Sequence, residues 1–119
     1  MNFKIIHSEF EYLSWPEVKK ISQDIRSTII WPFGAVEQHG PHLPLATDSI
    51  FVDEIICEVL KLIPSDLPVK KLPTQYIGFS PEHKGFDGTI SLSSNLITSL
   101  IKEVGVQLAD MGFKRLLLI

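Results

Sequence analysis

The chain has 119 residues, of which 45% are hydrophobic and 21% are charged, and its formal net charge is −3 at pH 7. This length suits one domain, and the composition is that of an ordinary globular protein rather than a disordered one. Acidic and basic residues are scattered without a basic patch, which argues against nucleic acid and anionic membrane surfaces as partners.

Targeting and redox features are sparse. The first residues lack the apolar core of a signal peptide, and no stretch approaches the roughly 20 apolar residues that a membrane span needs. The single cysteine, Cys57, cannot form an internal disulfide, and its apolar neighbours predict a buried structural thiol. These observations predict a cytoplasmic protein.

The amino-terminal region predicts one helix before the first buried strand. Residues 3–6 form a candidate strand or edge segment, and His7 beside them is expected at the surface or with an internal partner. Ser14, followed three residues later by Glu17, forms a capping-box pattern, so a helix is predicted from about Trp15 to Asp24. The almost continuous apolar run 28–33 then predicts a strand covered on both faces.

The rest of the chain alternates in the same way. A helix is predicted over 50–62, a strand-like segment over 67–72, a second helix that is capped near Ser93 and ended by Gly112, and a central strand over 114–119. The apolar stripe of the first helix consists of Ile50, Phe51, Ile55, Val59 and Leu62, widened by Cys57 and Leu60. The stripe of the second consists of Leu96, Ile97, Leu100, Ile101, Val104, Leu108 and Met111. Both stripes are expected to face the core. This alternation predicts an α/β fold with a mostly parallel sheet.

Residues 34–48 join the first strand to the next helix and carry the most informative side chains. Glu37 and His39 are two residues apart, so in extended backbone both leave the same face, whereas Gln38 would face away. Asp48 lies where the helix begins and has two oxygens that can bridge cations. Carboxylates with a neutral imidazole suit Zn²⁺, Mn²⁺ or Fe²⁺ better than Ca²⁺ or Mg²⁺. The loop therefore predicts half of a metal site.

A plainer interpretation of this loop stays open on composition and spacing. Asp48 can be a helix N-cap, since a carboxylate there accepts from free backbone N–H groups. Glu37 can be a solvated carboxylate, and His39 and His42 can be ordinary loop histidines.

Three blocks of the sequence resemble the creatininase (creatinine amidohydrolase) family: residues 34–48, 80–92 and 112–119. The resemblance implies a three-layer sandwich with a mostly parallel sheet, in which residues 1–119 form a single creatininase-like domain, the amino-terminal portion of the fold. The chain then stops after a central strand, before the later loops that carry further metal-binding residues in the family. Asp87 stands where the family usually has proline, which adds a charge near the pocket.

The resemblance also implies an activity, hydrolysis of an amide carbon–nitrogen bond, often a cyclic one, by a metal-activated hydroxide. Two divalent metals (Zn, Mn or Fe) would be held in a complete site, with Glu37 binding one, His39 the other and Asp48 bridging them. Glu82 and His83 would line the substrate pocket or support the metal shell without being ligands. By the same resemblance the substrate is a small-molecule amide and the protein a homo-oligomer.

Two other functions remain in view. Three ligands are few for two metals, so this chain alone would lack the complete active site, and the alternative is a noncatalytic α/β binding or assembly module that retains a partial metal site. A flavodoxin-like small-molecule binder would explain the strand–helix alternation, but it would leave Glu37, His39 and Asp48 as a coincidence.

Overall fold

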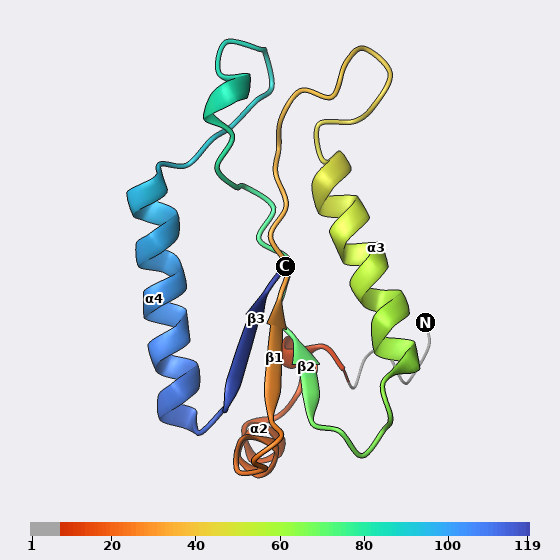
Figure 1. Cartoon of the computed structure of the whole chain (residues 1–119), viewed down its shortest axis with the longest axis vertical. Coiled ribbons are helices and arrows are strands. Elements are labelled where there is room, and N and C mark those ends of the chain that lie inside the picture. The colour runs from red at the N-terminus through yellow and green to blue at the C-terminus, as the bar shows by residue number, and fades with distance from the viewer. Residues whose placement is uncertain (1–7) are drawn as a thin grey trace.

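A three-stranded parallel sheet lies at the centre of the chain, for which the computed structural model describes residues 8–119 (Figure 1). The middle strand, β1 (Thr28–Trp31), pairs with β2 (Val69–Lys71) on one side and with β3 (Arg115–Leu118) on the other. All of β1 is buried, as its apolar run predicts, and it ends before Pro32, which has no N–H for the ladder. The expectations for residues 3–6 and His7 lie outside the described residues.

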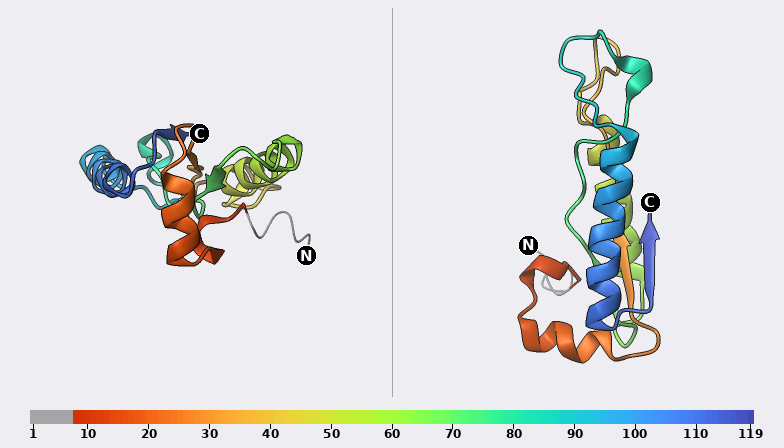
Figure 2. Two further views of the ribbon diagram at one scale, coloured as in Figure 1. Left: turned by 90° about the horizontal axis from the view of Figure 1, so that it is seen from below. Right: turned by 90° about the vertical axis from the view of Figure 1, so that its left-hand side faces the viewer.

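Helices cover both faces of this sheet. Successive residues of β1 point in opposite directions, so neighbouring residues of the strand pack against different helices. Ile29 packs with Leu108 of α4 (Ser94–Met111) and with α2 (Trp15–Ser22), whereas Ile30 packs with Ile56 and Leu60 of α3 (Thr47–Leu62). Figure 1 shows α3 and α4 on either side of the sheet, and Figure 2 shows α2 lying crosswise below it. The predicted three-layer α/β arrangement is confirmed.

Local signals place most helix ends of α2 and α4, whereas α3 begins at Thr47, earlier than the predicted residue 50. The backbone N–H of Ser14 donates to Glu17 Oε2 at 2.7 Å, which forms the expected capping interaction, although α2 ends at Ser22 rather than near Asp24. Ser93 caps α4 by accepting from the backbone N–H of Leu96. Gly112 ends α4 with a positive φ of 109°, which glycine adopts without strain. Two short 3-10 turns, η1 (Phe10–Tyr12) and η2 (Pro81–His83), complete the described elements.

The predicted inward face of α3 is wrong except at Leu60. The residues that pack against β1 are Val52, Ile56, Leu60 and, just beyond the helix, Ile63. Of the predicted stripe only Leu60 is fully buried, whereas Ile50, Phe51, Ile55, Val59 and Leu62 are exposed. Helical spacing is shared by both faces, so the spacing alone does not say which of them meets the sheet. Cys57, predicted to be buried, is only partly so, and burial raises the pKa of its thiol.

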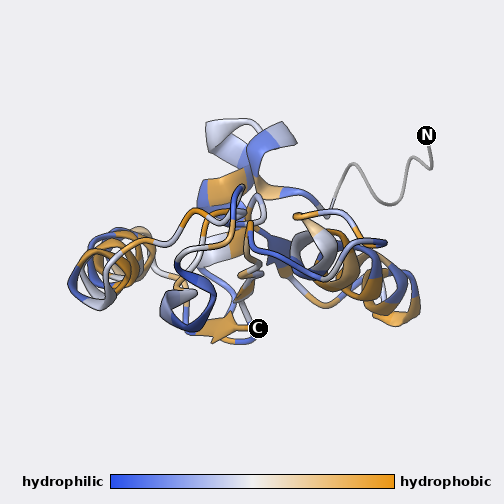
Figure 3. Cartoon of the chain, turned by 90° about the horizontal axis from the view of Figure 1, so that it is seen from above, coloured by the Kyte–Doolittle hydropathy of each residue, from blue (hydrophilic) through white to orange (hydrophobic). Residues whose placement is uncertain are grey.

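The expectation that residues 114–119 form a central strand is also wrong within the described part of the chain. β3 lies at the sheet edge, and Leu117, Leu118 and Ile119 are exposed. On α4 only Leu108 of the predicted stripe is fully buried, while Leu96 and Met111 are exposed. Exposed hydrophobic residues are therefore present on α3, α4 and β3 (Figure 3). Among the described residues no helix is both long and apolar enough to cross a membrane.

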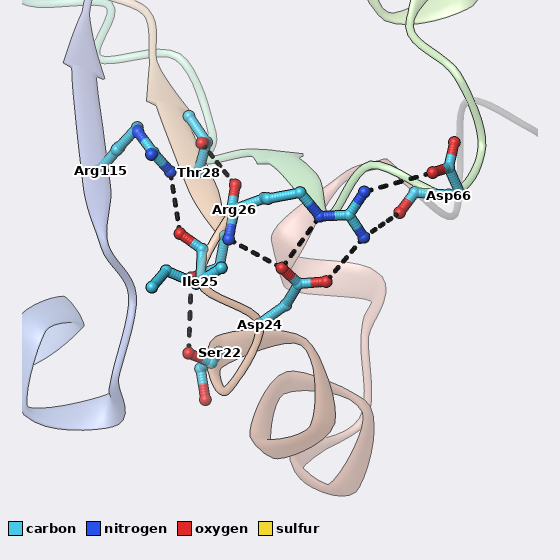
Figure 4. A network of polar contacts seen from close by, with 8 residues as sticks. Ser22, Asp24, Ile25, Arg26, Thr28, Asp66 and Arg115 are labelled. Atoms are coloured by element: carbon cyan, nitrogen blue, oxygen red, sulfur yellow. Dashed lines mark hydrogen bonds and ion pairs between the residues drawn. The ribbon is translucent and has the colours of Figure 1, made fainter.

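A polar network fastens the amino ends of the strands (Figure 4). The Arg26 guanidinium contacts Asp24 at 2.9 Å and Asp66 at 3.3 Å, which ties the turn before β1 to the segment before β2. Arg115 of β3 donates to the Ile25 carbonyl at 3.0 Å. The three strands are thus joined at the end opposite to the loops that carry the candidate ligands.

Candidate metal centre

Two long loops meet beyond the carboxyl ends of the strands, which is where open α/β sheets place their sites. One loop runs from β1 to α3 and the other from β2 to α4. Backbone bonds join them: Gly34 N donates to Gln75 O at 2.9 Å, and Ile90 N donates to Val36 O at 2.9 Å. The Gln38 N–H also donates to the Thr89 hydroxyl at 3.0 Å. The loops consequently form one bonded unit around Glu37.

Close packing at Gly34 sets the start of the first loop. A Cβ on this residue would lie 2.5 Å from the Cα of Ser49, so only glycine fits at this contact. Ser49 is itself fully buried, and its hydroxyl donates to Ala35 O at 3.1 Å and lies 3.3 Å from Tyr76 O. The first turn of α3 is therefore held against both loops.

Glu37, His39 and Asp48 come together as the sequence predicts: one potential ligand atom from each lies within 4.8 Å of the others. Glu37 is buried at 8% exposure, and its backbone N–H donates to Leu45 O at 3.0 Å. Asp48 lies in the first turn of α3, where the helix dipole favours a carboxylate. The N-cap is Ala46, so the alternative interpretation of Asp48 as the N-cap is wrong.

The hydrogen bonds of His39 show how well this group fits a cation. Its Nδ1 lies 3.1 Å from the Glu37 carbonyl oxygen, and a carbonyl only accepts, so Nδ1 carries the proton. The lone pair of the neutral ring is then on Nε2, which lies 3.1 Å from Asp48 Oδ1, another acceptor. Two acceptors this close require a proton or a cation between them. Metal-binding histidines are held in this same way, by a bond from the other ring nitrogen to a carbonyl or carboxylate.

The same contacts govern the protonation of His39. The Glu37 carbonyl, which accepts from Nδ1, and the Asp48 carboxylate together outweigh partial burial and raise the pKa of His39 above its ordinary value. Without a cation, the proton is therefore held more tightly than in a free imidazole. A metal ion would take the place of that proton on Nε2.

Glu82 and His83, predicted as pocket residues, belong to η2 and reach the same carboxylate from the second loop. Glu37, Glu82 and His83 offer ligand atoms within 4.8 Å of one another, and His83 Nε2 lies 3.7 Å from Glu37 Oε1. Glu82 is exposed and His83 half-buried. Glu37 is thus common to both groups of metal-capable side chains found among residues 8–119.

Other polar residues of the two loops lie outside these two groups. His42 and Asp87 are exposed and belong to neither group. Gln38, predicted to face away, contacts His83 through its side chain at 2.9 Å. Sequence reasoning missed this contact because 45 residues separate the partners, and no local pattern encodes it.

Comparison with known proteins agrees with this geometry. The family model for creatininase, described as creatinine amidohydrolase, matches residues 11–119. A mycofactocin precursor peptide peptidase of Mycobacterium tuberculosis is 39% identical over 84 residues, covering 66% of this chain and 34% of the relative. A creatinine amidohydrolase of Pseudomonas putida is 26% identical over 111 residues, covering 89% of this chain and 41% of the relative.

Solved structures give the same result. A creatininase described as a Mn form aligns with a TM-score of 0.83 at 25% identity, covering 93% of this chain and 44% of that one. A mutant creatininase of Zn-Zn type aligns with a TM-score of 0.82, covering 93% and 43%. The chain thus spans about a third to two fifths of the length of the curated relatives that it matches. A family match over almost the whole chain, together with the fold and the clustered loop residues, places this chain in the creatininase family.

Proposed function

We propose that this chain supplies the first metal-binding loop of a metal-dependent amidohydrolase that cleaves an amide carbon–nitrogen bond. One observation supports this above the others: the Nε2 lone pair of His39 and the Asp48 carboxylate face each other at 3.1 Å, next to the buried Glu37 carboxylate. Three protein ligands are the number that catalytic zinc sites use, since a position must stay open for water or substrate.

The metal is proposed to be a divalent transition ion. One imidazole and two carboxylates suit Zn²⁺, Mn²⁺ or Fe²⁺, and the similar creatininase structures include Mn and Zn forms. When bound, such a cation supplies Lewis acidity toward an amide carbonyl oxygen and toward water. The chain's own residues hold its position: Glu37 through a buried carboxylate, His39 through the bond to the Glu37 carbonyl, and Asp48 through the first turn of α3.

The substrate is proposed to be an amide, and two kinds deserve testing because the relatives differ. One relative carries the name of a peptide peptidase and the other that of a creatinine amidohydrolase. Both reactions break a carbon–nitrogen bond of an acyl group, so one ligand group serves either. A second metal, further ligands and assembly into a homo-oligomer belong to the same proposal for the complete protein.

The test is calorimetric titration of the metal-free chain with Zn²⁺ and Mn²⁺, for the wild type, Asp48→Asn and the control Asp110→Asn. Asp110 is an exposed carboxylate near the end of α4, remote in sequence from the loop. We expect the wild type and the control to bind with the same affinity and Asp48→Asn to bind at least about tenfold more weakly. Equal affinities for all three proteins, or no binding by the wild type, would refute the metal site.

Hydrolysis is measured separately on the metal-loaded chain, with creatinine and with a short peptide as substrates. Product that forms only with added metal and is lost in Asp48→Asn supports the enzyme. Metal binding without hydrolysis of either substrate supports the noncatalytic binding module for this chain.

A further inference from the structure

The Gln38 side chain has a defined orientation. The backbone N–H of Gly40 donates to Gln38 Oε1 at 2.9 Å, and a backbone N–H can only donate, so this atom of the amide is the oxygen. If the amide were turned over, two donors would face each other at this contact. The amide nitrogen of Gln38 must therefore point the other way, toward His83.

The amide nitrogen in turn fixes the tautomer of His83. Gln38 Nε2 lies 2.9 Å from His83 Nδ1, and an amide nitrogen only donates, so Nδ1 must accept. A neutral imidazole has one protonated nitrogen, and in His83 that nitrogen is Nε2. His83 is thus the opposite tautomer to His39, whose proton lies on Nδ1.

The Nε2–H of His83 faces the Glu37 carboxylate, with 3.7 Å between Nε2 and Oε1. This distance is longer than a hydrogen bond, but donor and acceptor attract, and the carboxylate is buried where few water molecules compete. A lone pair on Nε2 would be needed for His83 to bind a cation together with Glu37 and Glu82. In this tautomer Nε2 carries the proton, so it has no lone pair available for a cation.

We propose that Gln38 is a positioning residue that holds His83 as the Nε2–H tautomer, so that His83 donates toward the Glu37 carboxylate instead of binding a metal. The two histidines around Glu37 then have separate tasks: His39 presents a lone pair to a cation, and His83 presents a proton to a ligand of that cation. The assignment of the His83 tautomer does not depend on a bound metal. Its effect on metal affinity rests on the proposed function.

The tautomer is measured by long-range proton–nitrogen NMR on the metal-free, ¹⁵N-labelled chain, at a pH where its imidazoles are neutral. In the wild type we expect a protonated, pyrrole-type Nε2 and an acceptor, pyridine-type Nδ1 for His83. Gln38→Glu still accepts from the Gly40 N–H but cannot donate to His83, so its Nδ1 should become protonated. The control Gln23→Glu, at an exposed residue just after α2, should leave the His83 pattern unchanged.

Two outcomes would overturn the proposal: a proton on Nδ1 of His83 in the wild type, or an unchanged His83 pattern in a folded Gln38→Glu variant. The wild-type spectrum decides the tautomer even where a variant fails to fold. Zn²⁺ affinity then tests the role, because His83→Gln keeps an N–H donor near the Nε2 position and His83→Leu does not.

We expect His83→Gln to stay within about threefold of wild-type affinity and His83→Leu to lose about tenfold, the lower end of the range for partners of metal ligands. Equal losses in both variants would show that His83 binds the metal itself. Failure of the wild type to bind Zn²⁺ would remove the proposed function and leave the tautomer assignment to the NMR result.

Discussion

Nε2 of His39 and Oδ1 of Asp48 lie 3.1 Å apart, and neither carries a proton when the ring is neutral and donates its Nδ1–H to the Glu37 carbonyl. This pair couples metal binding to pH, since a cation and a proton compete for the same lone pair.

We expect Zn²⁺ affinity to fall as the pH is lowered through the pKa of His39. The Glu37 carbonyl and the Asp48 carboxylate raise that pKa above its ordinary value, so the loss should begin at a higher pH than for a free imidazole. Protonation of His39 also stabilises the metal-free folded chain. This stabilisation is fully present below the ordinary histidine pKa of about 6.5 and is lost as the pH rises through the raised pKa of His39. Titrations across this range, with His42→Gln as the exposed control, measure the effect.

The buried face of α3 is tested by a pair of alanine substitutions. Ile56 is 2% exposed and contacts β1, whereas Phe51 on the other face is 68% exposed. Ile56→Ala should lower the free energy of unfolding by about 2–5 kcal/mol because it opens a cavity. Phe51→Ala should change it by less than about 1 kcal/mol. Urea unfolding measures both, and a larger loss for Phe51→Ala would contradict the packing described for α3.

The tight contact at Gly34 predicts a strong effect from a single methyl group. Gly34→Ala would push a Cβ to 2.5 Å from the Cα of Ser49 and should cost about 2 kcal/mol or more. Gly105 of α4 is a matched control, because its added Cβ would lie 3.7 Å from Leu116 Cδ2, an ordinary contact. Gly105→Ala should stabilise the chain by about 0.5–1 kcal/mol through helix propensity. Thermal unfolding gives both signs, and a Gly34→Ala variant as stable as the wild type would contradict the contact.

A buried lysine shared by two carboxylates predicts unequal effects of neutralising each. Lys71 Nζ lies 2.9 Å from Asp53 and 3.1 Å from Glu9, and Lys71 is 4% exposed. Burial raises the pKa of Glu9 in spite of Lys71. Burial also opposes ionisation of Asp53, but the bonds from Thr74 and Lys71 prevail and lower its pKa.

Asp53→Asn should therefore cost about 1–3 kcal/mol at pH 7, and Glu9→Gln less than about 1 kcal/mol. The contribution of Asp53 is present above its unfolded pKa and is lost as the pH falls through the lowered folded value, below about pH 4. The contribution of Glu9 has the opposite sign, since its ionisation with rising pH is disfavoured in the fold. Unfolding curves at about pH 2, 4 and 7 distinguish the two, because the loss for Asp53→Asn should shrink only at the lowest pH. Equal losses in both variants at pH 7 would refute the unequal sharing of Lys71.

The sequence predicted those features that depend on neighbouring residues. The run 28–33 identified β1 because a strand buried on both faces needs continuous apolar residues, and Gly112 identified the end of α4 because a positive φ suits glycine. Glu37 and His39 lie in one loop and Asp48 in the helical turn that follows it, so their spacing was enough to bring them together.

Features set by distant partners were not predictable in this way. The register of α3 on β1 selects Val52, Ile56 and Leu60 as the buried face, although the opposite face is also apolar. The position of β3 at the edge depends on which strands pair with it rather than on its own residues. The Gln38–His83 contact joins two loops whose relative position only the complete sheet defines.

The closeness of Glu37, His39 and Asp48 along the chain also has a kinetic consequence. The Glu37 amide and the Leu45 carbonyl close a short segment that already contains His39, and loops of about ten residues close in roughly 10–100 ns, much faster than distant strands pair. Cation ligands can therefore assemble before the sheet does. A divalent ion should then speed the folding of this chain as well as slow its unfolding. The ion would stabilise the first loop early, before the loop between β2 and α4 packs against it.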